Sequence, residues 1–298
     1  MILLDGGMGR ELMRMGAPFR QPEWSALALI EAPNLVTVAH GNFVAAGASV
    51  ITTNSYAIVP FHIGAPLFAS DGQRLAAVAG RCARDAADNA DHRVLVAGSL
   101  PPLFGSYQPE LFDPLAAPSI LTPLIAGLAP YVDLWLGETL SRIDEARCVR
   151  AAIDRIGDTR PLWLSFTLDD HRPGCLRSGE SIDLAVQAAH ELGAGAVLFN
   201  CCQTETISSA LRSLVGTTTL RIGGYANRFV DSHDSDGAAN ADLSPFRDDM
   251  SPSEYSSCVR GWIDDGAEIV GGCCGMGPEH IAELRSMLAS ATPEPRKP

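Results

Sequence analysis

The sequence predicts an α/β fold, a (β/α)8 TIM barrel in which residues 1–298 form a single domain. Three observations lead to this prediction. Eight short apolar runs alternate with helix-like segments, the pattern of a parallel barrel rather than of separate sheets and bundles. Polar or sulfur-containing side chains follow most of these runs, and active sites of such barrels lie at the C-terminal ends of the strands. No Gly-x-Gly-x-x-Gly follows the first run, so a dinucleotide-binding sheet is not indicated.

The first two units illustrate how the elements are predicted. Residues 2–4 form a short apolar run closed by Asp5 and two glycines, which predicts a strand with a carboxylate at its end. Residues 34–46 carry apolar side chains at helical spacing. The β-branched run 48–53 predicts the second strand, and polar Asn54 follows it.

The same alternation continues to the C-terminus. Further strands are predicted at 94–97, 132–136, 162–166, 196–199, 219–222 and 268–270. Further helices are predicted at 72–89, 119–129, 143–156, 182–192, 204–214, 252–265 and 278–288. Residues 101–118 are rich in proline and aromatic residues, and we expect a long loop there.

The segment 227–251 is the one stretch of low hydrophobicity and little periodicity. We predict a solvated loop over the barrel mouth. Its aspartates offer metal binding as a less favoured alternative: Asp231, Asp234, Asp236, Asp242, Asp248 and Asp249. We expect the tail 292–298 to be frayed.

Composition and charge exclude several classes of protein. The formal net charge is −13, and basic residues cluster only at Arg296-Lys297, so nucleic acid and anionic membranes are not expected partners. No run approaches the roughly 18 apolar residues of a membrane-spanning helix, and the N-terminus lacks the basic flank of a secretory signal. We therefore expect a cytoplasmic protein. In that reducing compartment its eight cysteines are available for metal binding, catalysis or packing rather than for disulfides.

Two groups of cysteines follow predicted strands. Cys273 and Cys274 are adjacent and flanked by glycines, and Cys201 follows the sixth run. Adjacent cysteines do not easily form a disulfide with each other, but a flexible glycine-rich backbone allows both to bind one metal ion. Strands six and eight are separated by one neighbour, so Cys201 is the expected third ligand. Thiolates select zinc, and three protein ligands leave its fourth position open to a substrate. The alternative is that these cysteines pack as small hydrophobic residues.

Such a zinc site suits the capture of a thiol substrate, since zinc lowers the pKa of a thiol. We predict that Asp5 and Glu138 bind an ammonium group, and that backbone amides at Gly6-Gly7 and Asn54-Ser55 bind a carboxylate. The structural alternatives are a turn or helix cap for Asp5 and an ion pair at the rim for Glu138. Two tyrosines that follow strands, Tyr56 and Tyr225, are expected to line the pocket of a cationic electrophile or to serve in ordinary packing.

Several motifs together resemble the homocysteine S-methyltransferase family, in order along nearly the whole chain. They are Asp5-Gly6-Gly7-Met8-Gly9, Trp24-Ser25-Ala26, Ile51-Thr52-Thr53-Asn54-Ser55-Tyr56, Gly98-Ser99, Glu138-Thr139, Asn200-Cys201, Tyr225-Ala226-Asn227 and Gly271-Gly272-Cys273-Cys274-Gly275. The resemblance implies a zinc-dependent barrel that transfers a methyl group to homocysteine and gives methionine. It implies that zinc is bound by Cys201, Cys273 and Cys274. It also implies the substrate-binding residues, which are Asp5, Gly6, Asn54, Glu138, Tyr225 and Asn227.

Departures from the family pattern fall where the methyl donor is expected to bind. Arg10 replaces a common threonine, Ala226 replaces the proline of Tyr-Pro-Asn, and residues 100–104 differ from a common Gly-Pro form. The expected donor is a sulfonium compound, S-methylmethionine or S-adenosylmethionine, with betaine as the alternative. Another thiol or a selenol is the alternative acceptor. A different hypothesis makes the protein a ligand-binding barrel without turnover, in which Cys202 closes a structural zinc site.

Overall fold

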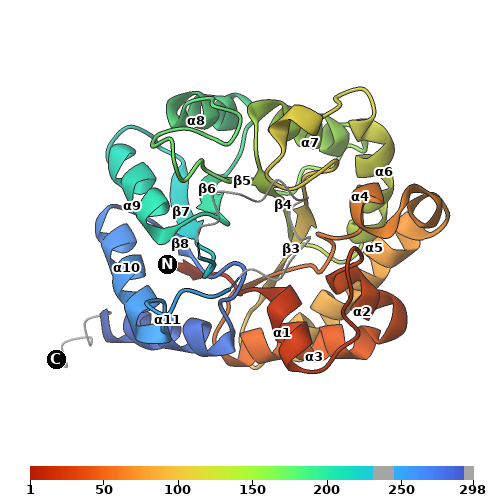
Figure 1. Cartoon of the computed structure of the whole chain (residues 1–298), viewed down its shortest axis with the longest axis horizontal. Coiled ribbons are helices and arrows are strands. Elements are labelled where there is room, and N and C mark those ends of the chain that lie inside the picture. The colour runs from red at the N-terminus through yellow and green to blue at the C-terminus, as the bar shows by residue number, and fades with distance from the viewer. Residues whose placement is uncertain (231–244, 292–298) are drawn as a thin grey trace.

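Eight parallel strands follow one another around a ring, and helices surround the ring on its outside (Figure 1). The structure is a computed structural model that describes residues 1–230 and 245–291. Strands pair in the order β1-β8-β7-β6-β5-β4-β3-β2, and a parallel bridge between Leu4 and Val50 joins the two ends of this series. The predicted (β/α)8 barrel is therefore confirmed. The strands are β1 (Ile2–Leu3), β2 (Val50–Thr52), β3 (Leu95–Leu100), β4 (Leu134–Leu140), β5 (Leu162–Phe166), β6 (Ala196–Asn200), β7 (Arg221–Tyr225) and β8 (Ile269–Val270).

The helices cover the outer face of the barrel and part of its rim. They are α1 (Met8–Arg14), α2 (Ser25–Glu31), α3 (Pro33–Ala45), α4 (Pro60–Ile63), α5 (Ala65–Asp88), α6 (Ala117–Leu128), α7 (Ile143–Arg155), α8 (Ile182–Glu191), α9 (Thr204–Ser213), α10 (Pro252–Asp264) and α11 (Pro278–Ala291), with a 3-10 turn at Pro109–Leu111. The sequence did not predict α1, α2 and α4, because each is too short to show a periodic apolar pattern. Helix α5 begins at Ala65 rather than at residue 72, and Pro66 occupies one of its first positions, where proline is well tolerated.

Alternation along the strands separates the core into two layers. In β6, Ala196 and Leu198 point into the barrel, whereas Val197 and Phe199 point outward to the helices. The same alternation places Leu134 and Leu136 of β4 inside the barrel. The inward positions nearest the C-terminal ends of the strands are therefore the ones that form the mouth. They carry polar or aromatic side chains, namely Thr52, Ser99, Glu138, Asn200 and Tyr225.

His40 is an exception within the outer layer. It lies on α3 with its side chain fully buried, and neither ring nitrogen has a hydrogen-bond partner among the residues that the structure describes. Burial lowers the pKa of His40 to about 3. The ring is therefore neutral in the folded protein at a pH where it is charged in the unfolded chain.

We expect His40 to make the fold sensitive to acid. Because its folded-state pKa lies below the ordinary value of 6.5, the unfolded chain binds an extra proton as the pH falls below that value. The contribution of neutral His40 to the free energy of unfolding is therefore fully present above the ordinary pKa, and about 2 kcal/mol of it is lost at about pH 5. The variant His40→Leu has a side chain of similar volume that does not titrate, so it should not lose stability at low pH in this way. Urea unfolding of both proteins at about pH 5 and pH 8 measures the difference, and an equal pH dependence in the two would contradict this assignment.

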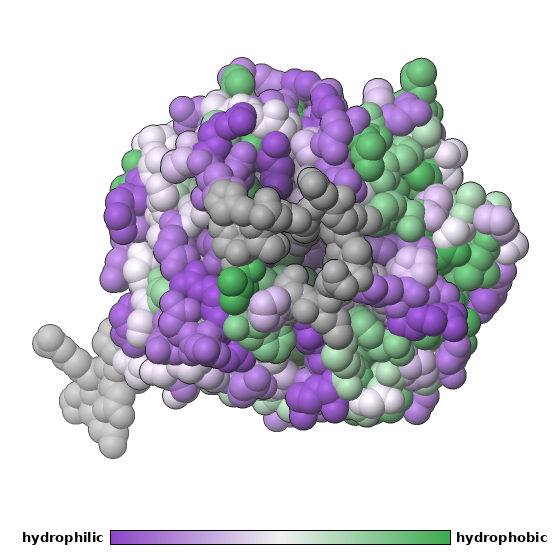
Figure 2. All heavy atoms as spheres, in the orientation of Figure 1, coloured by the Kyte–Doolittle hydropathy of each residue, from purple (hydrophilic) through white to green (hydrophobic). Residues whose placement is uncertain are grey.

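The surface in the view of Figure 2 is mainly hydrophilic, with hydrophobic side chains gathered over α4, α5 and α6. Two of the exposed apolar side chains are Leu111 and Leu115, which precede α6. Within the described ranges, no helix combines the length and the apolar character needed to cross a bilayer.

The predicted loop 227–251 is described only at its two ends. Phe229 and Phe246 form an antiparallel bridge there, and their rings stack with centroids 5.9 Å apart. Asp249 accepts hydrogen bonds from Arg247. The predicted metal-binding aspartates Asp231, Asp234, Asp236 and Asp242 lie outside the described residues, as does the tail 292–298.

Candidate metal centre and active site

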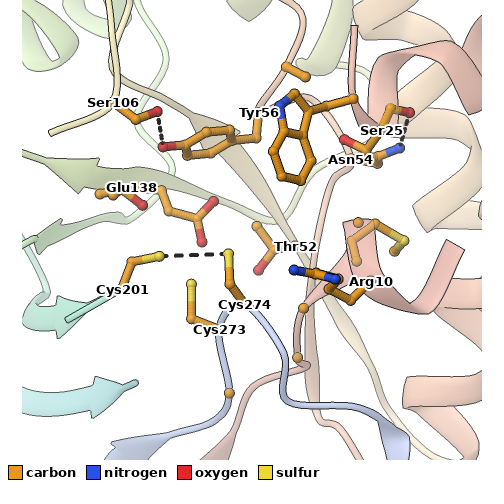
Figure 3. A pocket seen from close by; sticks show the side chains of 18 of the residues that line it. Arg10, Ser25, Thr52, Asn54, Tyr56, Ser106, Glu138, Cys201, Cys273 and Cys274 are labelled. Atoms are coloured by element: carbon orange, nitrogen blue, oxygen red, sulfur yellow. Dashed lines mark hydrogen bonds between the residues drawn. The ribbon is translucent and has the colours of Figure 1, made fainter. Parts of the chain in front are cut away.

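Three cysteine sulfurs meet at the C-terminal end of the barrel (Figure 3). Cys201 follows β6, Cys273 and Cys274 follow β8, and β7 lies between these strands. Their Sγ atoms, which we call the sulfur triangle, all lie within 4.8 Å of one another, and those of Cys201 and Cys274 are 3.7 Å apart. Thiolates that bind one tetrahedral zinc ion at about 2.3 Å are about 3.8 Å apart. The spacing and the chemistry of these donors therefore fit a thiophilic metal.

The backbone at these cysteines is arranged to bring the three sulfurs together. Cys201 has a φ of 54°, in the left-handed region, and its amide donates to the carbonyl of Tyr225. The amide of Cys273 donates to the carbonyl of Ala226, the residue that directly follows β7. Gly275 has a φ of 83°, which a glycine adopts without strain, and it turns the chain after the cysteine pair.

The turn between β1 and α1 lies directly against the cysteine loop. The amide of Gly7 donates to the carbonyl of Met276 at 2.8 Å. A Cβ atom at Gly7 would lie 2.7 Å from the carbonyl oxygen of Cys273 and 3.1 Å from the Cα of Cys274. Both are backbone atoms, so the cysteine loop itself would have to move.

We therefore expect Gly7→Ala to lower metal affinity by at least about tenfold, because it displaces the loop that carries two ligands. Gly9→Ala is a matched control in the same turn, since a Cβ there meets only side-chain atoms, at 3.8 Å or more. The measurement is zinc content after dialysis against a graded series of chelator. Equal zinc retention by the two variants would contradict the role given to Gly7.

Two carboxylates, the buried Asp5 and the half-buried Glu138, face the cavity beside the sulfur triangle. Glu138 accepts hydrogen bonds from Ser99 Oγ at 2.6 Å and from the Tyr225 hydroxyl at 3.3 Å. Burial raises the pKa of Glu138 to about 7. The carboxylate of Asp5 accepts from the amide of Thr52 at 2.7 Å and from its hydroxyl at 3.1 Å. Burial raises the pKa of Asp5 to about 8, and the negative charge of Glu138 adds to the increase.

These contacts argue against the structural alternatives that the sequence offered for the two acids. Glu138 accepts hydrogen bonds from the hydroxyl groups of two buried residues, Ser99 and Tyr225. The prediction of an ion pair at the rim is therefore wrong. Asp5 binds Thr52 of the neighbouring strand, so it caps neither its own turn nor α1. Asp5 also holds β1 and β2 together where the ring closes.

The other predicted site residues divide between the cavity and its surroundings. The amides of Gly7 and Ser55 donate to backbone carbonyls, so of the four amides predicted to bind a carboxylate only those of Gly6 and Asn54 stay predictions. Asn54 lines the cavity, but its side-chain amide donates to the carbonyl of Ser25 at the start of α2. Asn227 lies outside the cavity wall and accepts from the amide of Phe229. Gly6 lines the cavity.

Cys202 does not close the metal site. Its side chain is fully buried in the layer between strands and helices, and it is not part of the sulfur triangle. Burial also raises the pKa of its thiol, which disfavours the thiolate that a metal requires. The hypothesis of a structural zinc closed by Cys202 is therefore contradicted by its position.

Sequence reasoning missed several residues of the site. The hydroxyl of Tyr107 lies 2.8 Å from Cys201 Sγ, and the guanidinium of Arg177 lies 4.8 Å from the ring centroid of Tyr107. Asn200 accepts from Ser165 Oγ and donates to Thr139 Oγ1, which fixes the end of β6 just before Cys201. The signal for Tyr107 was its place in an aromatic-rich loop after a strand, and the signal for Asn200 was its inward position on β6.

A cavity of about 970 Å³, counting its open mouth, joins these groups. Its wall includes the sulfur triangle, both carboxylates, and four larger side chains: Arg10, Trp24, Tyr56 and Phe229. The predicted cavity positions of Tyr56 and Tyr225 are confirmed, and the Tyr56 hydroxyl contacts Ser106 Oγ at 2.7 Å.

Comparison with known proteins agrees with this arrangement. The family described as homocysteine S-methyltransferase matches residues 2–288. Homocysteine S-methyltransferase of Escherichia coli (strain K12) is 29% identical, and the match covers 96% of this chain and 94% of that protein. Selenocysteine methyltransferase of Astragalus bisulcatus is 27% identical over 97% of this chain and 92% of its own. The crystal structure of the metallated homocysteine methyltransferase MmuM from Escherichia coli superimposes with a TM-score of 0.80, 26% identity and 96% coverage of both chains. Since the match spans every strand of the barrel and all three cysteines at its mouth, the chain belongs to the homocysteine S-methyltransferase family, a family of methyltransferases.

Proposed function

We propose that this protein transfers a methyl group from a sulfonium donor, S-methylmethionine or S-adenosylmethionine, to homocysteine and so produces methionine. The metal is zinc, bound by Cys201, Cys273 and Cys274. The observation that carries the proposal is the sulfur triangle, which opens into a cavity that is also lined by two carboxylates. When held by these three thiolates, zinc would lower the pKa of the acceptor thiol, so that its thiolate would be present at neutral pH.

The two carboxylates support an acceptor that carries an ammonium group. Asp5 is buried and Glu138 is half-buried, and the charge of Glu138 adds to the effect of burial in raising the pKa of Asp5. A cation bound between them relieves this repulsion and favours the ionised form of both groups. Ser99 and Tyr225 orient Glu138 toward the cavity. Homocysteine has both features required here, a thiol for the sulfur triangle and an ammonium group for the acids.

The reaction is a direct displacement. The proton of the acceptor thiol leaves to solvent when the thiolate forms. The thiolate sulfur then attacks the methyl carbon, a new carbon–sulfur bond forms, and the bond from that carbon to the donor sulfonium breaks. The electron pair of the broken bond stays on the donor sulfur, which departs as a neutral thioether. The cavity walls hold both reactants in line, which removes much of the entropic barrier to their meeting.

A selenol is the second candidate acceptor, because a relative that matches 97% of this chain is a selenocysteine methyltransferase. Selenocysteine carries the same ammonium group and a selenolate in place of the thiolate. Betaine remains the alternative donor, since its quaternary ammonium is also a cationic methyl carrier and suits the aromatic side chains of the cavity.

The test is product formation by zinc-loaded protein. Homocysteine is combined in turn with S-methylmethionine, S-adenosylmethionine and betaine, and methionine is measured by mass spectrometry. We expect methionine with one of the sulfonium donors and none after zinc is removed. Absence of methionine with all three donors would refute the proposed reaction. Parallel assays with selenocysteine compare the two acceptors at equal concentration.

A further inference from the structure

The cavity wall holds both acidic and basic side chains. Asp5 and Glu138 supply carboxyl groups, and Arg10 supplies a positive group from α1. Among the described residues of the cavity wall, Arg10 is the only arginine or lysine. Figure 3 shows its guanidinium pointing from α1 into the space beside Cys274 and Thr52.

Arg10 is held in this position by aromatic rings. Its guanidinium carbon lies 4.8 Å from the ring centroid of Phe246 and 5.4 Å from that of Phe229. These two rings stack with an interplanar angle of 13°, so they form one aromatic surface at the described ends of the segment 227–251. A guanidinium packed against aromatic rings keeps N–H donors at its edge, and these match the two oxygens of a carboxylate.

We propose that Arg10 binds a carboxylate of the methyl donor, so that the donors of this protein are sulfonium or ammonium compounds that also carry a carboxylate. This inference rests on the proposed function. A cationic donor placed near Arg10 meets a like charge, which disfavours simple onium compounds such as trimethylsulfonium. A donor with a carboxylate offsets that repulsion by pairing with the guanidinium. Arg10 thus determines the specificity of the protein for its methyl donor.

The position of the acid groups explains why the donor, rather than the acceptor, is assigned to Arg10. The acceptor must place its thiol at the sulfur triangle and its ammonium between Asp5 and Glu138. The donor must reach that thiol within the same cavity, whose wall also includes Arg10 and Phe229. The carboxylate of the acceptor is assigned to the predicted amides of Gly6 and Asn54, which line the cavity, and Arg10 is then the charged group that recognises a donor carboxylate.

The experiment compares Arg10→Met and Arg10→Lys with wild-type zinc protein in steady-state kinetics. Methionine keeps the packing against Phe229 and Phe246 but removes the charge. Lysine keeps the charge but lacks the planar pair of N–H donors that a guanidinium offers to a carboxylate. Arg14→Met is the matched control, because Arg14 is on the same helix but has 63% of its side chain exposed and does not line the cavity. The donors are the carboxylate-bearing compound that wild type uses best and trimethylsulfonium, which has no carboxylate.

We expect Arg10→Met to raise the donor KM by roughly 10- to 100-fold, the effect of losing a charge-assisted hydrogen bond, with the homocysteine KM changed less than about twofold. With trimethylsulfonium, Arg10→Met should equal or exceed wild type. Arg10→Lys should fall between wild type and Arg10→Met, and Arg14→Met should match wild type. A rise in the homocysteine KM instead, or an equal loss with both donors, overturns the inference.

Calorimetric titration gives a readout that does not depend on turnover. Each zinc-loaded variant is titrated with S-methylmethionine and with trimethylsulfonium in the absence of acceptor. Weaker binding of S-methylmethionine by Arg10→Met alone supports the inference, and unchanged binding overturns it. Failure of the proposed function is distinct, because it appears as absence of methionine from the wild-type protein.

Discussion

Cys201→Ser is expected to lose bound zinc and methyl transfer together. The Sγ atom of Cys201 is one corner of the sulfur triangle, and it lies 3.7 Å from the Sγ atom of Cys274. Serine keeps a similar size but replaces a soft thiolate by a neutral hydroxyl, which zinc binds poorly. We expect a loss of metal affinity above the roughly 100-fold typical of outer-shell partners. Zinc per chain, measured by mass spectrometry of metals, and methionine formation are the two readouts.

Cys202→Ala is the control for this experiment. It changes the adjacent cysteine, which is buried in the outer core layer and outside the sulfur triangle. We expect it to retain about one zinc per chain and to lose about 1 kcal/mol of stability, as small truncations in a core do. If Cys201→Ser kept its zinc, or if Cys202→Ala lost it, the assignment of the metal ligands would be wrong. The pair of variants therefore separates metal binding from simple core packing.

The barrel and the sulfur triangle at its mouth could be predicted because they depend on local pattern. Each strand is an apolar run bounded by turn residues, and β6 and β8 necessarily lie two places apart in a parallel ring. Cys201 and the Cys273-Cys274 pair follow the strands directly, so closure of the barrel brings them to the same side. Glu138 follows from the same logic, as an inward position near the end of β4.

The parts that could not be predicted depend on contacts between distant loops. Asn54 binds the carbonyl of Ser25 because α2 begins beside it, and α2 shows no periodic signal in seven residues. Tyr107 reaches Cys201 from a loop after β3, a separation of 94 residues. The amide of Gly7 is engaged because the turn after β1 packs on the cysteine loop. Residue types alone did not indicate which amides and hydroxyls these loops would leave available.

Glu138→Gln is expected to weaken homocysteine binding more than donor binding. Glutamine retains the shape of the side chain and an oxygen that accepts from Ser99 Oγ, so the local structure should persist. It lacks the negative charge that the acceptor ammonium requires. The loss of a charge-assisted hydrogen bond corresponds to about 1.5–3 kcal/mol, or roughly a 10- to 150-fold rise in the homocysteine KM. Steady-state kinetics with each substrate varied in turn measures the effect.

Glu145→Gln is the matched control, because it makes the same chemical change in a second glutamate whose pKa is raised. Glu145 caps the start of α7 by accepting from the amides of Ser141 and Arg142, and burial raises its pKa to about 7, as for Glu138. It does not line the cavity. We expect Glu145→Gln to alter thermal stability and leave the homocysteine KM unchanged. Equal kinetic effects of the two variants would mean that Glu138 supports the fold rather than the substrate, and the ammonium site would then have to be assigned to Asp5 alone.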